Sequence, residues 1–208
     1  MTLYSDTAKA QEELARKVIV SDALWPIENI CGVDVAYDGD QAYGSAVVMD
    51  RTGRTVIESA SSKTIAKHQY VPGLLMLREA EPILNTIKKL KKNYDLLLVD
   101  GHGLLHPRKC GLACYIGLTL DRPTIGVAKR LLCGTVRDDG FVELGGQVAG
   151  FAMSLSGKKK LFISVGHRIS LNTAVAFARE LGRGGIPEPL RLADANSKMQ
   201  KRGKGLGC

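Results

Sequence analysis

Hydrophobic positions in the first part of the chain change from a helical to a strand-like spacing. Ala10, Leu14 and Val18 recur at intervals of four within residues 7–19, so they lie on one face of a predicted helix. Three short runs of strand-forming residues follow, separated by glycine-containing turns. The pattern predicts one helix and then an antiparallel meander. The three strands are expected at residues 29–36, 43–50 and 54–60.

The rest of the chain alternates between helices and buried strands. Residues 73–92 show helical spacing of leucine and isoleucine, and Pro82 is expected to kink or restart that helix. Residues 95–100 (DLLLVD) form a continuous apolar run, which is typical of a strand covered on both faces. Further strands are predicted at 124–127, 148–153 and 160–165, and further helices at 110–120, 170–182 and 189–200.

Three antiparallel strands followed by alternating helices and strands is the element order of the ribonuclease H-like fold. The sequence therefore predicts the α/β class, with a ribonuclease H-like mixed β-sheet flanked by helices on both faces. The length favours a single domain, residues 1–208. Glycines in the last residues predict a flexible tail, 201–208, and the glycine-rich stretch between 134 and 151 has the composition of loops.

Charge changes the picture from a fold to a class of partner. The formal net charge of +8 favours a polyanion, with nucleic acid first and an anionic membrane or ribosome surface second. Five scattered cysteines do not suggest a disulfide framework, and Cys110 with Cys114 lacks the further ligands of a zinc site. The N-terminus is polar and no apolar run approaches about 18 residues, so a cytoplasmic protein without membrane association is expected.

Three acidic residues occupy positions that call for a chemical explanation. Asp34 interrupts the first predicted strand, Asp100 ends the apolar strand, and Glu79 lies in the helix between them. If the two strands are neighbours, the three carboxylates converge at one end of the sheet. Converging carboxylates repel one another unless a cation neutralises them, and Mg²⁺ or Mn²⁺ takes such oxygen ligands. The alternative is that they are separate surface or capping acids.

These acids lie within a series of short motifs that follow one another along the chain. The series closely resembles the endonuclease V family over roughly residues 8–198. The motifs are Gly32-Val33-Asp34-Val35-Ala36-Tyr37, Tyr70-Val71-Pro72-Gly73, Arg78-Glu79, Val99-Asp100-Gly101-His102-Gly103 with His106-Pro107-Arg108, Gly126-Val127-Ala128-Lys129, Gly166-His167-Arg168-Ile169-Ser170, and Pro187-Glu188-Pro189 with Arg191-Leu192-Ala193-Asp194.

The resemblance implies a metal-dependent endodeoxyribonuclease. It implies a cut at the second phosphodiester bond on the 3′ side of deoxyinosine, leaving 3′-hydroxyl and 5′-phosphate ends. It also implies that Asp34, Glu79 and Asp100 bind Mg²⁺, for which Mn²⁺ is expected to substitute. The four residues Tyr70, Val71, Pro72 and Gly73 match the family's strand-separating wedge, and an aromatic ring with a rigid proline suits the gap left by a flipped base. The alternative for them is a turn that enters the helix beginning at Gly73.

The base pocket follows from the family resemblance alone. Hypoxanthine carries an oxo group and a ring N–H where adenine has an amine and a bare nitrogen, and backbone groups beside glycine can distinguish the two. By analogy the pocket draws on Gly73, Leu75, Gly101, His106 and Leu132.

Four residues are candidates for contacts near the reacting phosphate. His106 is expected to orient water or to donate to a phosphate or a base, and its alternative is a loop histidine that bonds the backbone. Lys129, after a buried strand, is expected to contact the scissile phosphate, and its alternative is a solvated lysine. His167 and Arg168 precede a predicted helix and could hold a phosphate with its N–H groups, or form a capped turn.

Two further polar residues have an open role. His102 directly follows the Asp100-Gly101 pair and is interpreted mainly as orienting that loop. Asp194, on the last predicted helix, is either a fourth, outer acid of the metal site or an ordinary helix-surface acid.

The resulting hypothesis is a monomeric, Mg²⁺-dependent nuclease for DNA that contains deoxyinosine. The alternatives are a nuclease directed at inosine in RNA, a structure-selective nuclease for flaps, mismatches or junctions, and a non-catalytic binder of deaminated nucleic acid. A clustered carboxylate set argues against the last, because a binder does not need mutually repelling acids.

Overall fold

The computed structural model describes residues 3–23, 26–155 and 159–203. Within these ranges no helix is both long and apolar enough to span a lipid bilayer. The helices are α1 (Leu3–Ala15), α2 (Leu75–Ile87), α3 (Leu112–Leu120), α4 (Leu171–Gly182) and α5 (Glu188–Lys201). The strands are β1 (Asn29–Asp38), β2 (Gln41–Asp50), β3 (Val56–Ile65), β4 (Leu96–Asp100), β5 (Thr124–Ala128), β6 (Thr135–Val136), β7 (Phe141–Leu144), β8 (Gln147–Ser154) and β9 (Lys160–His167).

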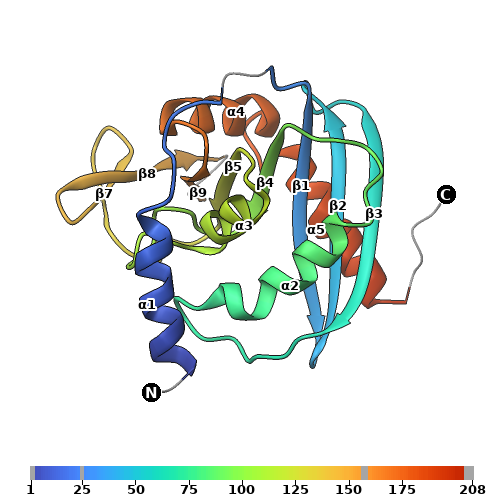
Figure 1. Cartoon of the computed structure of the whole chain (residues 1–208). Coiled ribbons are helices and arrows are strands. Elements are labelled where there is room, and N and C mark those ends of the chain that lie inside the picture. The colour runs from blue at the N-terminus through green and yellow to red at the C-terminus, as the bar shows by residue number, and fades with distance from the viewer. Residues whose placement is uncertain (1–2, 24–25, 156–158, 204–208) are drawn as a thin grey trace.

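The described strands form one mixed sheet in the order β3-β2-β1-β4-β5-β9-β8-β7-β6 (Figure 1). β1, β2 and β3 are the predicted antiparallel meander, and β4 and β5 run parallel to β1. β9 is antiparallel to β5 and starts a second meander through β8, β7 and β6. Because β1, β4 and β5 are parallel, their carboxyl ends meet at one edge of the sheet, which is where the acidic residues were expected.

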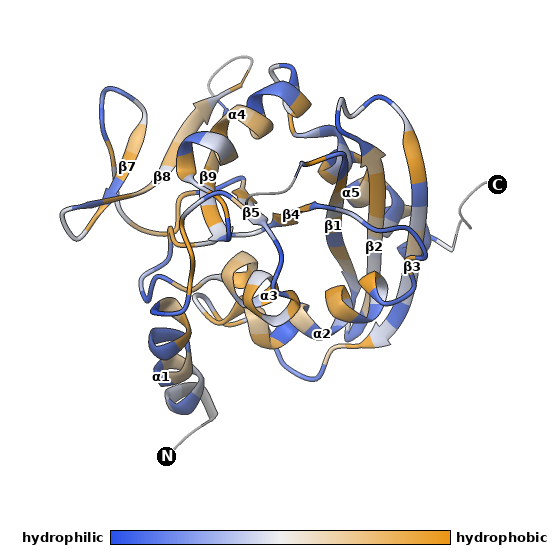
Figure 2. Cartoon of the chain, turned by 45° about the horizontal axis from the view of Figure 1, so that its top comes forward, coloured by the Kyte–Doolittle hydropathy of each residue, from blue (hydrophilic) through white to orange (hydrophobic). Residues whose placement is uncertain are grey.

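Helices cover both faces of the central strands, as the apolar run in β4 predicts. Leu96 and Leu98 pack on one side in a core with α4 and α5, whereas Leu97 and Val99 pack on the other side with α2 and α3. All four leucine and valine side chains are fully buried. Figure 2 shows β4 as a hydrophobic strand in the middle of the molecule. The mixed sheet flanked on both faces is therefore confirmed.

Pro82 does not restart α2, which runs continuously from Leu75 to Ile87. A proline at this position cannot donate to the carbonyl of Arg78, four residues earlier. The hydroxyl of Tyr37 on β1 donates to that carbonyl at 3.2 Å instead. A contact from a distant strand thus satisfies the group that the proline leaves free. Of the two expected outcomes, a kink or a restart, the restart does not occur.

The stretch between 134 and 151 contains strand structure that the sequence pattern did not predict. β6, β7 and β8 form an antiparallel meander. Gly145 and Gly146 make the turn between β7 and β8, with φ angles of +59° and +74°. Two consecutive positive φ values are typical of tight hairpin turns. These two glycines are loop residues as expected, and their loop is the tight turn that joins β7 to β8. At the chain's end, Lys201 still belongs to α5, and most of the predicted flexible tail (204–208) lies outside the described residues.

Candidate active site

Three carboxylates from separate parts of the chain meet at the carboxyl ends of β1 and β4. Val33 pairs with Val99, so the next residue of each parallel strand, Asp34 and Asp100, lies at the same level of the sheet. Asp194 approaches them from α5. One carboxylate oxygen of each residue lies within 4.8 Å of the other two, and all three residues are partly buried. The sheet therefore brings together Asp34 and Asp100 with Asp194, for which a place in the metal site was one of two predicted roles.

Asp194 reaches this position because α5 packs directly on β1. A Cβ atom on Gly32 would lie only 2.3 Å from the carbonyl carbon of Pro189, so only glycine permits this approach of helix to strand. Three residues beyond Asp194, the fully buried Ser197 donates its hydroxyl to Asp34 at 2.6 Å. The close contact and this hydrogen bond fix the carboxylates of β1 and α5 relative to each other.

The carboxylates alter one another's protonation. Burial, together with the charges of Asp100 and Asp194, raises the pKa of Asp34 to about 6 despite the hydrogen bond from Ser197. Burial and the charges of Asp34 and Asp100 raise the pKa of Glu79 on α2 well above its ordinary value. Glu79 therefore lies close enough to Asp34 and Asp100 for their charges to act on it. It lies outside the group of three carboxylates whose oxygens are within 4.8 Å of one another. The cluster holds more negative charge than it can keep ionised at low energy.

Two lysines offset part of this charge. The ammonium of Lys129 lies 2.5 Å from an oxygen of Asp100 and 3.6 Å from an oxygen of Asp194. Lys198 pairs with the other oxygen of Asp194 at 2.7 Å. Both lysine side chains are about half exposed, so solvent weakens these pairs. Lys129 follows β5, and its ammonium lies among the carboxylates.

The donor set fits a divalent cation with oxygen ligands. Oxygens on opposite sides of Mg²⁺ are about 4.2 Å apart, which is twice the usual bond length. The oxygens of Asp34, Asp100 and Asp194 lie within 4.8 Å of one another, so small side-chain rotations close them around one ion. A cation there would also relieve the repulsion that raises the pKa of Asp34. These three residues, with Glu79 beside them, form a candidate metal site.

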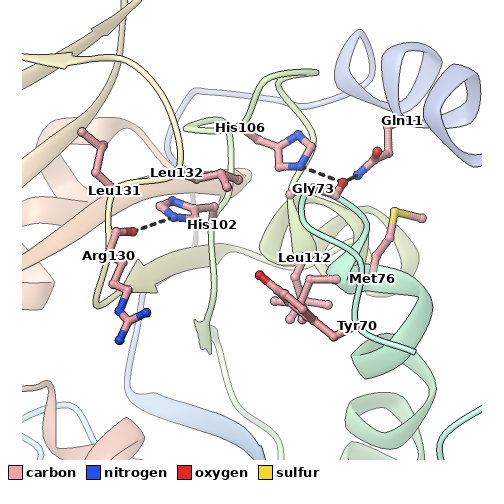
Figure 3. A pocket seen from close by; sticks show the side chains of 12 residues that line it. Gln11, Tyr70, Gly73, Met76, His102, His106, Leu112, Arg130, Leu131 and Leu132 are labelled. Atoms are coloured by element: carbon pink, nitrogen blue, oxygen red, sulfur yellow. Dashed lines mark hydrogen bonds between the residues drawn. The ribbon is translucent and has the colours of Figure 1, made fainter. Parts of the chain in front are cut away.

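A cavity of about 240 Å³ opens near the start of α2 and the segment after β5 (Figure 3). His102 in its wall is two residues after Asp100, and Arg130 directly follows Lys129, so the cavity adjoins the metal site. Most of the wall is apolar, with a few polar side chains. The lining residues are Gln11, Tyr70, Gly73, Leu75, Met76, His102, His106, Gly111, Leu112, Arg130, Leu131 and Leu132.

The carbonyl of Gly73 anchors the predicted wedge to the cavity wall. Nitrogen atoms of Gln11, His106 and Arg108 lie 3.2, 3.0 and 2.6 Å from this one oxygen, and the first two contacts are visible in Figure 3. Gly73 has a φ of +76°, and a Cβ atom there would lie 3.2 Å from the Arg108 guanidinium. The positive φ favours glycine at this point, and the close guanidinium leaves little room for a side chain. On the same loop Tyr70 is 60% exposed and borders the cavity.

His106 bonds the backbone through both ring nitrogens. Its Nε2 bonds to the carbonyl of Gly73, and its Nδ1 accepts from the backbone N–H of Arg108 at 3.2 Å. Burial and the charge of Arg108 lower the pKa of His106 to about 4, so the ring is neutral and carries its proton on Nε2. These contacts match the alternative of a loop histidine that bonds the backbone. A direct catalytic contact by His106 stays a prediction.

His102 links the metal site to the opposite wall of the cavity. Its Nε2 lies 3.0 Å from the carbonyl of Arg130, which is the residue after Lys129. Its Nδ1 is buried and has no hydrogen-bond partner among the described residues. The contact ties the loop after β4 to the loop after β5, which supports the predicted orienting role.

His167 and Arg168 lie far from this site. His167 pairs with Thr124 at the start of β5, whereas Lys129 follows Ala128 at its end. Five strand residues span about 16 Å. The structure therefore does not bring the predicted phosphate-binding pair to the carboxylates.

Both residues already have carboxylate partners. Arg168 donates to both oxygens of Asp121 at 2.6 and 2.9 Å, and the buried His167 lies 3.2 Å from the same carboxylate. Asp22 accepts from the backbone N–H of Ser170 at 2.8 Å, at the start of α4. A phosphate would have to displace these acids, so the contacts are those of the alternative, a capped turn.

Comparison with known proteins decides the family. The sequence model of endonuclease V matches residues 12–195. The chain belongs to the endonuclease V family. Endonuclease V of Thermofilum pendens is 43% identical over 94% of this chain and 88% of its own length. That of Archaeoglobus fulgidus is 37% identical over 93% of this chain and 91% of its own length.

Solved endonuclease V structures share the fold. The structure from Streptomyces avermitilis matches with a TM-score of 0.87 at 35% identity, covering 95% of this chain and 93% of that one. Endonuclease V from Ciona intestinalis, in complex with a 24mer DNA containing an inosine followed by a ribo-adenosine, matches with a TM-score of 0.85 at 26% identity, covering 96% and 98%. The family resemblance of the motifs and the predicted fold class are both confirmed.

The remaining predicted site residues lie in or beside the cavity. Gly73, Leu75, His106 and Leu132 line the cavity, and Gly101 lies beside it, since a Cβ there would lie 3.4 Å from Leu112. Val71 is half-buried, Pro72 is exposed and Leu132 is 39% exposed, so the rim is partly open to solvent.

Sequence reasoning missed the residues that hold the site in shape. Gln11, Arg108, Arg130 and Ser197 each contact it through long-range hydrogen bonds. Arg108 belongs to the motif His106-Pro107-Arg108, which was a usable signal. No local sequence signal marked Gln11 and Ser197, because their hydrogen-bond partners, Gly73 and Asp34, lie 62 and 163 residues away in the chain.

Proposed function

We propose that this endonuclease V nicks DNA at the second phosphodiester bond on the 3′ side of deoxyinosine, leaving 3′-hydroxyl and 5′-phosphate ends. The observation that carries the proposal is the cavity of about 240 Å³ adjoining three partly buried carboxylates. Two residues of chain, from Asp100 to His102, span at most about 7 Å. A base held in the cavity therefore puts a phosphate on its 3′ side near the carboxylates.

The relative from Ciona intestinalis supports hypoxanthine as the base, because its DNA contains inosine. The apolar wall with a few polar groups suits a flat heterocycle taken out of the base stack. Gly73 and Gly101 would let the backbone approach the oxo group and the ring N–H of that base. Tyr70, Val71 and Pro72 would fill the gap left in the duplex.

Asp34, Asp100 and Asp194, with Glu79 as a further carboxylate, would hold Mg²⁺, or Mn²⁺ in its place. When bound, such an ion activates water and stabilises the leaving oxygen. Ser197 keeps one oxygen of Asp34 directed by its hydrogen bond of 2.6 Å. The ammonium of Lys129 would contact the scissile phosphate as a point charge, and its pairing with Asp100 keeps it in place.

The test is nicking of an end-labelled duplex that carries one deoxyinosine, beside its unmodified twin. We expect a single cut at the second phosphodiester bond on the 3′ side of the lesion, in Mg²⁺ or Mn²⁺ and not in EDTA. Only the lesion-bearing strand should be cut. A cut independent of inosine would point to a structure-selective nuclease, and the deoxyinosine assignment would then be wrong.

An inosine-directed cut in RNA is the second candidate. The ribo-adenosine beside the inosine in the Ciona complex favours testing it. A single 2′-hydroxyl contact can decide between the two nucleic acids. A matched RNA substrate, assayed in parallel at equal concentration, measures the preference as a ratio of rates.

We further propose that the enzyme acts as a monomer in the cytoplasm. The carboxylates and the cavity wall come from one chain, so the site needs no second copy. Light scattering of the pure protein at assay concentration should give the mass of one chain, 22.4 kDa. A dimer whose dissociation abolishes nicking would contradict this.

A further inference from the structure

A second hollow lies on the other side of the carboxylates from the base cavity. It is a groove of about 600 Å³ whose floor is apolar and whose edge carries three lysines. The floor is made by Leu155, Leu161, Phe162 and Ile186, and the lysines are Lys129, Lys159 and Lys160.

The groove is continuous with the metal site. A narrow cleft lined by Asp100, Asp194 and Lys129 shares Lys129, Leu161 and Ile186 with the groove. One side of the cleft is therefore the carboxylate cluster, and the other side is the groove.

Part of the groove lies on the opposite face of the sheet from the base cavity. Leu161 belongs to the core under α4 and α5, and Ile186 packs against it, whereas Met76 and Leu112 of the cavity belong to the core under α2 and α3. Phe162, the next residue of β9, packs on the other side of the strand in a third cluster, so the groove curves around the end of β9. The carboxyl ends of β4 and β5, with the metal site, lie between the two. A strand whose base occupies the cavity and whose phosphate reaches Asp100 has a path across this edge into the groove.

Charge favours a nucleic-acid backbone as the occupant. Lys159 and Lys160 are exposed, and the ion pairs among the described residues include neither of them. Two unpaired ammonium groups next to a carboxylate cluster supply positive charge where a polyanion must leave a negatively charged site. Apolar side chains beneath them suit sugar rings and bases.

We propose that this groove binds the cleaved strand on the 3′ side of the cut, with Lys159 and Lys160 contacting its phosphates. The inference rests on the proposed function, since that function defines which strand is cut and where. It adds a contact that sets how much strand beyond the cut the enzyme needs.

The test compares two deoxyinosine duplexes with wild type and Lys159→Ala/Lys160→Ala. In one duplex the lesion strand ends one nucleotide beyond the cut, and in the other it continues for six. Binding is measured in EDTA by fluorescence anisotropy at several salt concentrations, and nicking is measured in Mg²⁺. Wild type should prefer the longer strand. The double variant should lose that preference, and its salt dependence on the longer duplex should be shallower by about 1.8 in log K against log salt, for two phosphate contacts on duplex DNA.

Lys91→Ala/Lys92→Ala is the matched control. It removes the same charge from exposed lysines that lie before β4, at the opposite end of the sheet from the carboxylates. It should keep the length preference and the salt dependence on the short and long strands alike. Equal behaviour of the two double variants would overturn the groove assignment while leaving the cut itself intact. If wild type does not nick either deoxyinosine duplex, the proposed function fails first, and the strand path fails with it.

Discussion

Charged residues gather at both ends of β5, and the two clusters differ in how their charge is balanced. At the carboxyl end, Asp34, Asp100 and Asp194 crowd within 4.8 Å, and the ammonium of Lys129 is shared between two of them. At the amino end, the exposed carboxylate of Asp121 accepts hydrogen bonds from two guanidinium nitrogens of Arg168, Nε and Nη2.

The difference distinguishes a candidate cation site from an ion pair that only holds the structure together. The amino-end cluster satisfies itself, because the bidentate pair of Asp121 with Arg168 leaves little for a ligand to add. The carboxyl-end cluster does not, since burial and neighbouring acids raise the pKa of Asp34 to about 6. An unbalanced, partly buried set of acids is a place where an external cation lowers the energy. Imbalance of charge, more than the presence of charge, marks the candidate active site.

The largest expected effect comes from Asp34→Asn, which removes one carboxylate but keeps its size. Nicking should fall by about a thousandfold or more, because metal-ion charge stabilisation is worth several kcal/mol and each 1.4 kcal/mol is tenfold in rate. Single-turnover nicking in saturating Mg²⁺ measures the loss. Lesion binding in EDTA should change little, since the cavity wall is untouched.

The same variant distinguishes loss of metal from loss of fold. Saturating Mg²⁺ should raise the melting temperature of wild type, since a ligand at about 100 times its Kd adds about 2.7 kcal/mol. Asp34→Asn should show a much smaller shift, and without metal it should be at least as stable as wild type because repulsion is relieved. Equal metal-induced shifts in both proteins would place the ion elsewhere.

Lys129→Met is expected to have the next largest effect. The loss of a preorganised positive group beside a reacting phosphate typically costs about 10²- to 10³-fold in rate. The apparent affinity for Mg²⁺ should not fall, because the neighbouring carboxylates lose a competing cation. Rates over a Mg²⁺ titration separate the two effects, and Lys129→Arg, which keeps the charge, should recover part of the rate. A lysine that merely balances charge would show tighter Mg²⁺ binding without a slower cut.

Local pattern was sufficient for the central strands and for two of the acids, although not for β6 and β7. The run DLLLVD has no polar residue in its middle, so burial on both faces was its only low-energy placement, and an acid at its end had to lie at the sheet edge. Asp34 interrupts an apolar strand, which is costly without a purpose. Both positions follow from the chemistry of single segments, and the structure places them side by side.

Long-range packing decided what pattern left open. The sequence left Asp194 either as an outer acid of the metal site or as an ordinary helix-surface acid, and the approach of α5 to Gly32 places it beside Asp34. For Arg168 the sequence left a phosphate contact and a capped turn open, and the structure pairs it with Asp121, 47 residues earlier. The role of each charge depends on a partner that the neighbouring sequence does not contain.

Arg108→Met should have an intermediate effect, on the cavity that borders the unbalanced cluster. It removes the shortest of the three contacts to the Gly73 carbonyl, at 2.6 Å. A hydrogen bond from a charged group is worth about 1.5–3 kcal/mol, so the preference for deoxyinosine over unmodified DNA should fall by up to about 10- to 100-fold. Competition between the two duplexes measures it. Lys109→Met, which changes a neighbouring exposed side chain, is the control and should keep the preference. An unchanged preference in Arg108→Met would mean that Gln11 and His106 suffice to hold the wedge.

The smallest effect is expected at the self-balanced end of β5, from Arg168→Met. The nicking rate should not change, because the carboxylates lie at the other end of the strand. A lower rate at saturating substrate would show instead that Arg168 leaves Asp121 to bind DNA, and the contrast between the two ends would disappear.

Stability should reveal what Arg168 does at that end. Hydrogen bonds from Arg168 and then from His167 lower the pKa of Asp121, and these three groups face one another. Since the pKa of Asp121 in the folded state lies below the unfolded value of about 3.9, the contribution to stability is complete above that pH. It is lost as the pH falls through the lowered folded-state pKa. Urea unfolding should therefore find Arg168→Met less stable than wild type at neutral pH, with the difference shrinking in strong acid. Arg168→Lys, which keeps the charge without the paired donors, should lie between them, and a difference that stays constant into acid would assign the loss to packing instead of the ion pair.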